Sequence, residues 1–155
     1  MNLTSPSQVK AWCLANGFHP NRTLGQNFLI DRNALTAIVD AGLGSATAPG
    51  VRVLEIGPGL GVLTEEMLAR GACVTAVEKD PVLAERLAGA LGNPPGLAVV
   101  AGDAFELIAG KAGTSSATPL GDFDYMVSNL PYQSGTRILL ELVMRRAVPS
   151  MTVLV

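Results

Sequence analysis

The chain has 155 residues, a formal net charge of −2, and 48% hydrophobic against 15% charged residues. This length suits one domain with its own core, and the composition excludes a disordered tail. Eleven basic against 13 acidic residues argue against a protein that grips nucleic acid by charge alone, and two distant cysteines favour a reducing cytoplasm over a disulfide scaffold. No apolar run reaches the length that crosses a membrane.

The chain begins with two helical stretches, at about residues 5–16 and 32–42, which bracket an aperiodic polar segment at 20–30. Five short apolar runs follow, at 51–56, 73–78, 97–101, 124–128 and 151–155. Runs that are apolar throughout, such as 97–101, are typical of strands covered on both faces. The spacing between runs leaves room for crossover helices.

Helical patterns occupy most of the gaps, at 60–70, after Asp80-Pro81, and at 136–147. Asp80 and Pro81 form a helix start signal, and Gly71 suits the left-handed end of the helix before it. Ile138, Leu139, Leu142 and Val143 share one apolar stripe of the helix at 136–147. The alternation predicts an α/β fold, a parallel sheet with right-handed crossovers and helices on both faces.

A glycine-rich turn follows the first strand, with Gly57, Gly59 and Gly61 at alternate positions after Glu55. Glycines allow a tight turn and a close approach of a ligand to the backbone. A dinucleotide fingerprint needs its third glycine at position 62, where Val62 stands, so a nicotinamide cofactor loses its best support. The pattern resembles the first motif of S-adenosylmethionine-dependent methyltransferases. The alternative is a tight turn without a ligand.

Two acidic residues end the next strands. Glu78 follows Gly57 by 21 residues, where an α/β sheet places a carboxylate against a ribose. Asp103 ends the third strand, where the methyltransferase arrangement has it accept a hydrogen bond from the adenine amino group. The structural alternatives are a strand-terminal carboxylate for Glu78 and a helix cap for Asp103.

The fourth strand ends in Asn129, Leu130, Pro131 and Tyr132. This run resembles the (Asn/Asp/Ser)-Pro-Pro-(Tyr/Phe) motif of methyltransferases that act on exocyclic amino groups. An adenine amino nitrogen is a poor nucleophile, and two acceptors, the Asn129 side chain and a carbonyl near Leu130, would free its lone pair. Tyr132 would stack on the base and Pro131 would stiffen the turn. The alternative is an ordinary turn after a strand.

Taken together, these motifs and the segment 24–29 resemble the rRNA adenine N6-dimethyltransferase family, in particular its small-subunit, KsgA-type branch. The resemblance implies N6,N6-dimethylation of two adjacent adenosines in a hairpin near the 3′ end of small-subunit rRNA, with a role in ribosome maturation. It implies a Rossmann-like fold, S-adenosylmethionine as cofactor, no metal, and an immature small ribosomal subunit as partner. It also implies a cytoplasmic monomer that has no membrane association.

The resemblance also assigns the site. The residues implied to bind the cofactor are Gln26, Asn27, Leu29, Glu55, Gly57, Gly59, Glu78, Asp103 and Asn129. The implied catalytic residues are Asn129, Leu130, Pro131 and Tyr132. Residues 1–48 are expected to form a helical segment whose loop covers the cofactor, and residues 49–155 the Rossmann-like core.

Three rival functions stay open. The large-subunit branch, which confers macrolide resistance, tends to have other residues at Gly25 and Leu130. An oxidoreductase is disfavoured by Val62, and a non-catalytic ribosome-assembly module is disfavoured by the intact run at 129–132. Sheets of the family have seven strands and a helical C-terminal RNA-binding domain follows them. We therefore expect this chain to lack two strands and that domain, to retain a weakened cofactor site and to be inactive alone.

Overall fold

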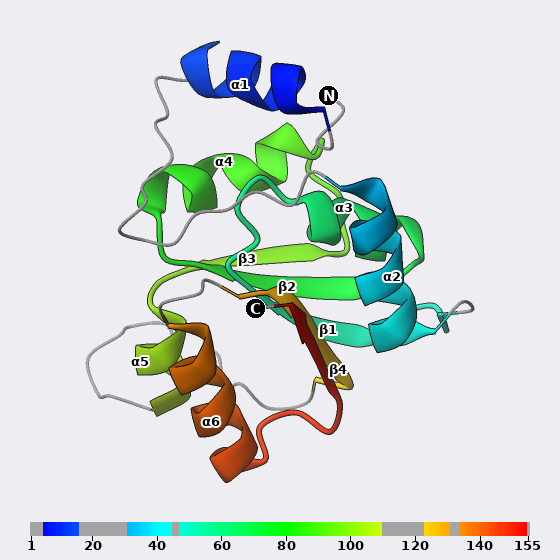
Figure 1. Ribbon diagram of the computed structural model, residues 1–155, viewed down its shortest axis with the longest axis vertical. Coiled ribbons are helices and arrows are strands. Elements are labelled where there is room, and N and C mark those ends of the chain that lie inside the picture. Colours follow the sequence, from blue (N-terminus) through cyan, green and yellow to red (C-terminus); the bar gives the residue numbers. More distant parts are fainter. Residues whose placement is uncertain (1–4, 16–30, 45–46, 110–122, 131–133, 155) are drawn as a thin grey trace.

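The computed structural model describes residues 5–15, 31–44, 47–109, 123–130 and 134–154, and these form a parallel sheet between two layers of helices (Figure 1). The strands lie in the order β3-β2-β1-β4-β5, and every neighbouring pair is parallel. Their bounds are β1 Arg52–Ile56, β2 Cys73–Glu78, β3 Leu97–Ala101, β4 Tyr125–Asn129 and β5 Met151–Leu154. The five predicted strands are confirmed to within one residue at each end.

Six helices accompany the sheet in the described ranges. They are α1 Pro6–Ala15, α2 Arg32–Leu43, α3 Val62–Ala69, α4 Pro81–Ala90, α5 Ala104–Ala109 and α6 Gly135–Arg145. The Asp80 side chain accepts hydrogen bonds from the backbone N–H groups of Val82 and Leu83, at 2.9 and 3.2 Å, so the predicted start of α4 is confirmed. Asp31 caps α2 in the same way. The short helix α5 was not among the predicted helices, although a helix cap at Asp103 was one of the structural alternatives.

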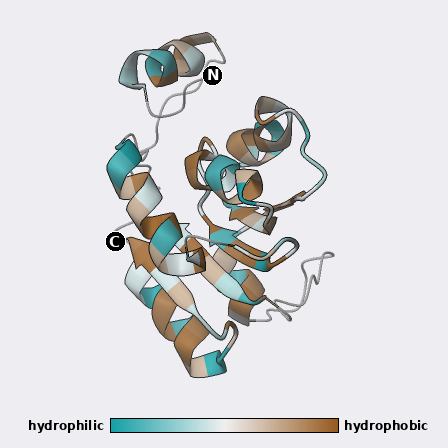
Figure 2. Ribbon diagram, turned by 90° about the vertical axis from the view of Figure 1, so that its right-hand side faces the viewer, coloured by the Kyte–Doolittle hydropathy of each residue, from teal (hydrophilic) through white to brown (hydrophobic). Residues whose placement is uncertain are grey.

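The two faces of the sheet carry separate cores. Helices α2, α3 and α4 cover one face, and α5 and α6 cover the other. Val53, Val74 and Val127 belong to the first core, whereas Leu54 and Met126 belong to the second, because successive side chains of a strand point to opposite faces. Along the helices, hydrophobic and hydrophilic residues lie side by side (Figure 2). The predicted layered α/β architecture is therefore confirmed.

The N-terminal helices pack on this framework. Gly42 of α2 lies so close to β4 that a Cβ atom there would be 2.5 Å from Cγ2 of Val127. Val9 and Cys13 of α1 are buried in the first core, although α1 lies outermost, above α4 (Figure 1). Helix α2 thus forms part of the first core. The division of the chain at residue 48 stays a prediction.

Two local expectations were wrong. Strand β3 is an edge strand with no fully buried residue, rather than one covered on both faces, because it lies last in the sheet order. Val143 is 53% exposed, whereas Ile138 and Leu142 of the same helix are buried. The face that α6 turns to the sheet is narrower than the apolar stripe in its sequence.

Candidate active site

The predicted site residues meet at the carboxyl edge of the sheet. From β1 the chain proceeds outward to β2 and β3, and then returns to β4 on the other side of β1. Ligands of open α/β sheets bind at such a reversal of strand order. The predicted residues that end the strands there are Gly57, Gly59, Glu78, Asp103, Asn129 and Leu130.

The glycine-rich turn depends on backbone angles that favour glycine. Gly57, Gly59 and Gly61 have φ values of 68°, 59° and 87°. The Gly57 N–H donates to the carbonyl of Val77 at 2.9 Å, which ties the turn to β2. A Cβ atom at Gly61 would approach Cδ1 of Leu87 to 2.6 Å. The third glycine therefore lets the turn pack closely against α4, and α3 begins at the next residue.

Glu78 links β2 to this turn and retains capacity for a ligand. Its side chain is 6% exposed, with Oε2 accepting from the Gly59 N–H at 3.0 Å and Oε1 accepting from the Asp80 N–H at 2.9 Å. Burial raises the pKa of this carboxyl, although the two N–H groups oppose the rise. Each carboxylate oxygen accepts more than one hydrogen bond. The residue thus fits the hydroxyls of a ribose.

Asp103 caps the start of α5, as its structural alternative predicted, and its carboxylate can still accept a hydrogen bond from a ligand. Its Oδ1 accepts from the Phe105 N–H at the start of α5, and its Oδ2 lies 2.9 Å from Nζ of Lys79. Burial by itself raises the pKa of Asp103, but the hydrogen bonds from Lys79 and Phe105 outweigh it and hold the pKa below the ordinary value. The ionised carboxylate can accept a further hydrogen bond from an amino group.

Glu55 lies beneath the turn rather than at its surface. The side chain is 1% exposed, and Oγ1 of Thr64 donates to its Oε2 at 2.6 Å. Burial raises the pKa of Glu55 to about 8; the Thr64 hydrogen bond opposes this rise and the charge of Glu78 adds to it. This geometry fixes the first turn of α3 to β1. Contact of Glu55 with a cofactor stays a prediction.

The end of β4 is fixed to both neighbouring strands. The buried Ser128 Oγ accepts from the Ile56 N–H at 2.9 Å, and the Leu130 N–H donates to the Leu154 carbonyl at 2.8 Å. The register pairs Leu54 with Met126 and, continued by three residues, brings Asn129 level with Gly57. Asn129, which is predicted to accept a hydrogen bond from the target amino group, thus lies beside the glycine-rich turn.

Five predicted site residues lie outside the described part of the chain and stay predictions: Gln26, Asn27, Leu29, Pro131 and Tyr132. Three further residues of this edge, Thr64, Ser128 and Lys79, were not predicted from the sequence. For Lys79 a signal was present, because a cation directly follows the strand-terminal Glu78. In the described ranges, no cluster of three or more His, Cys, Asp or Glu side chains could hold a metal ion.

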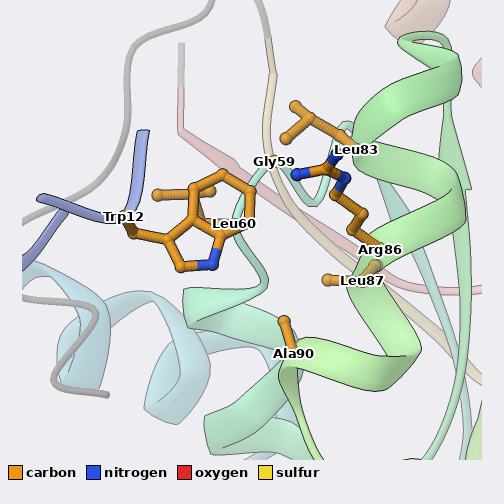
Figure 3. Close-up of a pocket in the computed structure, with 7 residues that line it drawn as sticks. All are labelled: Trp12, Gly59, Leu60, Leu83, Arg86, Leu87 and Ala90. Atoms are coloured by element: carbon orange, nitrogen blue, oxygen red, sulfur yellow. The ribbon is translucent and has the colours of Figure 1, made fainter. Parts of the chain in front are cut away.

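A small, mostly apolar pocket adjoins the turn (Figure 3). Trp12 of α1 lies beside Leu60, and Leu83, Arg86, Leu87 and Ala90 of α4 line the other side. Trp12 packs against the first core. No helix in the described segments is long and apolar enough to span a bilayer.

Fold and site together define a Rossmann-like domain of the S-adenosylmethionine-dependent methyltransferase class. The sequence model of one family of this class, "Ribosomal RNA adenine dimethylase", matches residues 17–155. The chain therefore belongs to the ribosomal RNA adenine dimethylase family, a family of S-adenosylmethionine-dependent enzymes, and the predicted resemblance is confirmed.

Relatives agree with this assignment. Ribosomal RNA small subunit methyltransferase A of Deinococcus radiodurans is 48% identical over 99% of this chain and 48% of its own length. The protein of the same name from Moorella thermoacetica is 37% identical over 94% of the chain and 50% of its own length. The chain thus spans about half the length of the curated relatives it matches.

Solved structures show the same fold. The 23S rRNA methyltransferase ErmE is 32% identical, with a TM-score of 0.59 over 79% of this chain and 45% of that one. A dimethyladenosine transferase from Plasmodium falciparum, 24% identical, has a TM-score of 0.55 over 76% of this chain and 38% of its own, and this likeness supports the fold alone.

Proposed function

We propose that the protein transfers methyl groups from S-adenosylmethionine to N6 of two adjacent adenosines in a hairpin near the 3′ end of small-subunit rRNA. One observation carries the proposal: the glycine-rich turn, Glu78 and Asp103 share one edge of the sheet with Asn129 at the end of β4. The protein then acts in the cytoplasm as a monomer on immature small ribosomal subunits, in ribosome biogenesis.

The cofactor supplies an activated methyl group, and the chain supplies its position. Glu78 accepts hydrogen bonds from the ribose hydroxyls, and Asp103 accepts one from the adenine amino group. The glycine-rich turn lets the amino-acid part of the cofactor approach the backbone of β1. Gln26, Asn27 and Leu29 belong to the proposed cofactor-binding residues as well.

The acceptor end works through orientation rather than through a strong base. The Asn129 side-chain oxygen and a carbonyl near Leu130 accept the two N–H groups of the target adenine, so its nitrogen lone pair is freed for attack. The nitrogen loses its proton after the methyl group has transferred. Tyr132 stacks on the base, which must leave its own stack to reach the site.

The small-subunit substrate is favoured over the large-subunit one. The small-subunit methyltransferases of D. radiodurans and M. thermoacetica are 48% and 37% identical to this chain, against 32% for the large-subunit enzyme ErmE. Two experimental outcomes would favour one of the alternative functions instead. Methylation of large-subunit rRNA alone would assign the macrolide-resistance branch, and cofactor binding without transfer to either rRNA would leave an assembly module.

The test has two stages. Calorimetry on this chain should detect S-adenosylmethionine binding and no binding of a nicotinamide dinucleotide. Methyl transfer is then measured with labelled cofactor on unmethylated small ribosomal subunits, by this chain and by a chimera that adds the part of the D. radiodurans relative beyond the matched region. We expect the chimera to label adjacent adenosines and this chain to label few or none. Failure of the chimera to label small-subunit rRNA would refute the proposal.

A further inference from the structure

Lys79 and Asp103 form an ion pair across the ends of two neighbouring strands. Lys79 directly follows β2, and Asp103 follows β3 by two residues. The Lys79 Nζ lies 2.9 Å from Asp103 Oδ2, and the side chains are 60% and 32% exposed. The register pairs Glu78 with Ala101, so the ion pair lies at the same edge as Glu78. Nothing in the proposed function uses Lys79.

The two oxygens of Asp103 are held by different groups. Oδ1 is fixed by the backbone N–H of Phe105 at 2.9 Å, which belongs to the cap of α5. Lys79 holds the other oxygen, Oδ2, and adds its ammonium group to the backbone N–H groups that orient the carboxylate. An ionised oxygen with one ammonium donor retains a lone pair, so a second donor can share it.

We propose that Lys79 is a positioning residue that sets purine specificity, because it holds Asp103 Oδ2 where the 6-amino group of an adenosyl ligand donates to it. This role rests on the proposed function, since it requires an adenosyl ligand. A carboxylate that stays ionised accepts hydrogen bonds and donates none. The pair thus favours a purine with an amino group at position 6 over one without it.

The effect should be modest in size and specific in pattern. Exposed ion pairs contribute little, so loss of Lys79 should weaken binding of S-adenosylhomocysteine by about two- to five-fold. An analogue with hydrogen in place of the 6-amino group makes no bond to Oδ2, so its affinity should not change. A merely structural role for Lys79 would weaken both ligands equally.

The experiment is calorimetric titration of this chain with the two ligands, for Lys79→Met and the parent chain. Lys79→Arg, which keeps a cation for the carboxylate, should restore most of the preference for the amino group. In an Asp103→Asn background, Lys79→Met should have no further effect on the preference. Arg145→Met serves as the matched control, because it removes a cation from another ion pair, with Glu141, at the end of α6.

The outcomes separate this inference from the function on which it rests. A parent chain that binds neither ligand overturns the proposed function and this role together. A parent chain that binds S-adenosylhomocysteine, but whose preference for the amino group is unchanged by Lys79→Met, overturns the role of Lys79 alone. Equal losses for both ligands do the same. Thermal unfolding of each variant is measured beside the titrations, since a loss of fold would weaken both ligands.

Discussion

The hydroxyl of Thr64 on α3 donates a 2.6 Å hydrogen bond to the carboxyl of Glu55 on β1, directly beneath the glycine-rich turn. Thr64 is fully buried and Glu55 is 1% exposed, so neither group exchanges this partner for water. A buried polar pair of this kind is costly to leave half satisfied. The bond therefore fixes the first turn of α3 relative to β1, and with it the backbone of the glycine-rich turn, which faces the cofactor in the proposed complex.

Stability should fall as the pH rises, because of Glu55. Its pKa is raised to about 8 in the folded chain, chiefly by burial, against 4.5 for an ordinary glutamate. The folded state thus binds the proton more tightly, and this contribution is full below the ordinary value and lost as the pH approaches 8. Each pH unit in that window costs on the order of 1 kcal/mol. Glu55→Gln stays neutral and should flatten the dependence.

The measurement is urea unfolding at several pH values between 4.5 and 8.5, for the parent chain, Glu55→Gln and Glu65→Gln. Glu65 is an exposed acid on α3, the helix that carries Thr64, and serves as the control. Glu78, whose pKa is also raised, titrates in all three proteins, so the difference between the curves reports chiefly on Glu55. Parallel curves for the parent chain and Glu55→Gln would contradict the burial argument.

Cofactor affinity should depend on Glu78. Its carboxylate accepts from the Gly59 and Asp80 N–H groups and, in the proposed complex, from the ribose hydroxyls. Glu78→Ala should weaken S-adenosylmethionine binding by about ten-fold or more, because charged hydrogen bonds contribute about 1.5–3 kcal/mol each. The assay is calorimetry on folded variants. Glu85→Ala on α4, an exposed acid, is the control, and an unchanged dissociation constant for Glu78→Ala would refute the ribose assignment.

Close packing of α2 on β4 makes Gly42 sensitive to a single added methyl group. A Cβ there would lie 2.5 Å from Cγ2 of the fully buried Val127, so Gly42→Ala should lower the free energy of unfolding by about 1–3 kcal/mol. Gly89 of α4 has open space around the same atom, so Gly89→Ala should be neutral or stabilising by up to about 1 kcal/mol.

A double variant tests whether the overlap is the cause. Val127→Ala alone should destabilise by removing buried groups, but it also clears the space that a Cβ at Gly42 needs. Gly42→Ala should therefore cost less in the Val127→Ala background than in the parent chain, as measured by denaturant unfolding. If the two losses of stability are strictly additive, the overlap with Val127 is not the cause, and α2 accommodates the methyl group by moving.

Much of this architecture could be predicted because its signals are local. Apolar runs define the five strands, Asp80-Pro81 defines the start of α4, and glycines at alternate positions define the turn after β1. The strand order is not encoded locally, which is why the exposure of β3 was missed. Val143 was misplaced because the periodicity of a helix shows which residues are apolar, but not how much of that face the sheet covers.

The site could be predicted only in outline. Glu78, Asp103 and Asn129 stand at strand ends, and parallel strands bring such ends to one edge. Their partners are tertiary. Lys79 meets Asp103 although 24 residues separate them, and Glu55 meets Thr64 only because α3 folds back over β1. The depth of Glu55 beneath the turn likewise follows from packing and has no signature in the sequence.

Asn129 should matter for transfer far more than for RNA binding. Its position level with Gly57 at the end of β4 suits a side chain that accepts an N–H of the target adenine, whereas phosphate contacts elsewhere supply most of the affinity for RNA. In the chimera that carries the remainder of the D. radiodurans relative, Asn129→Ala should lower methyl transfer to small ribosomal subunits by about a hundred-fold or more. Filter binding to the same subunits should change by less than about three-fold.

Asn33→Ala removes an exposed amide on α2 and should alter neither quantity. Full turnover by Asn129→Ala would refute the role in orienting the amino group, and parallel losses of binding and transfer would instead make Asn129 an RNA-binding residue.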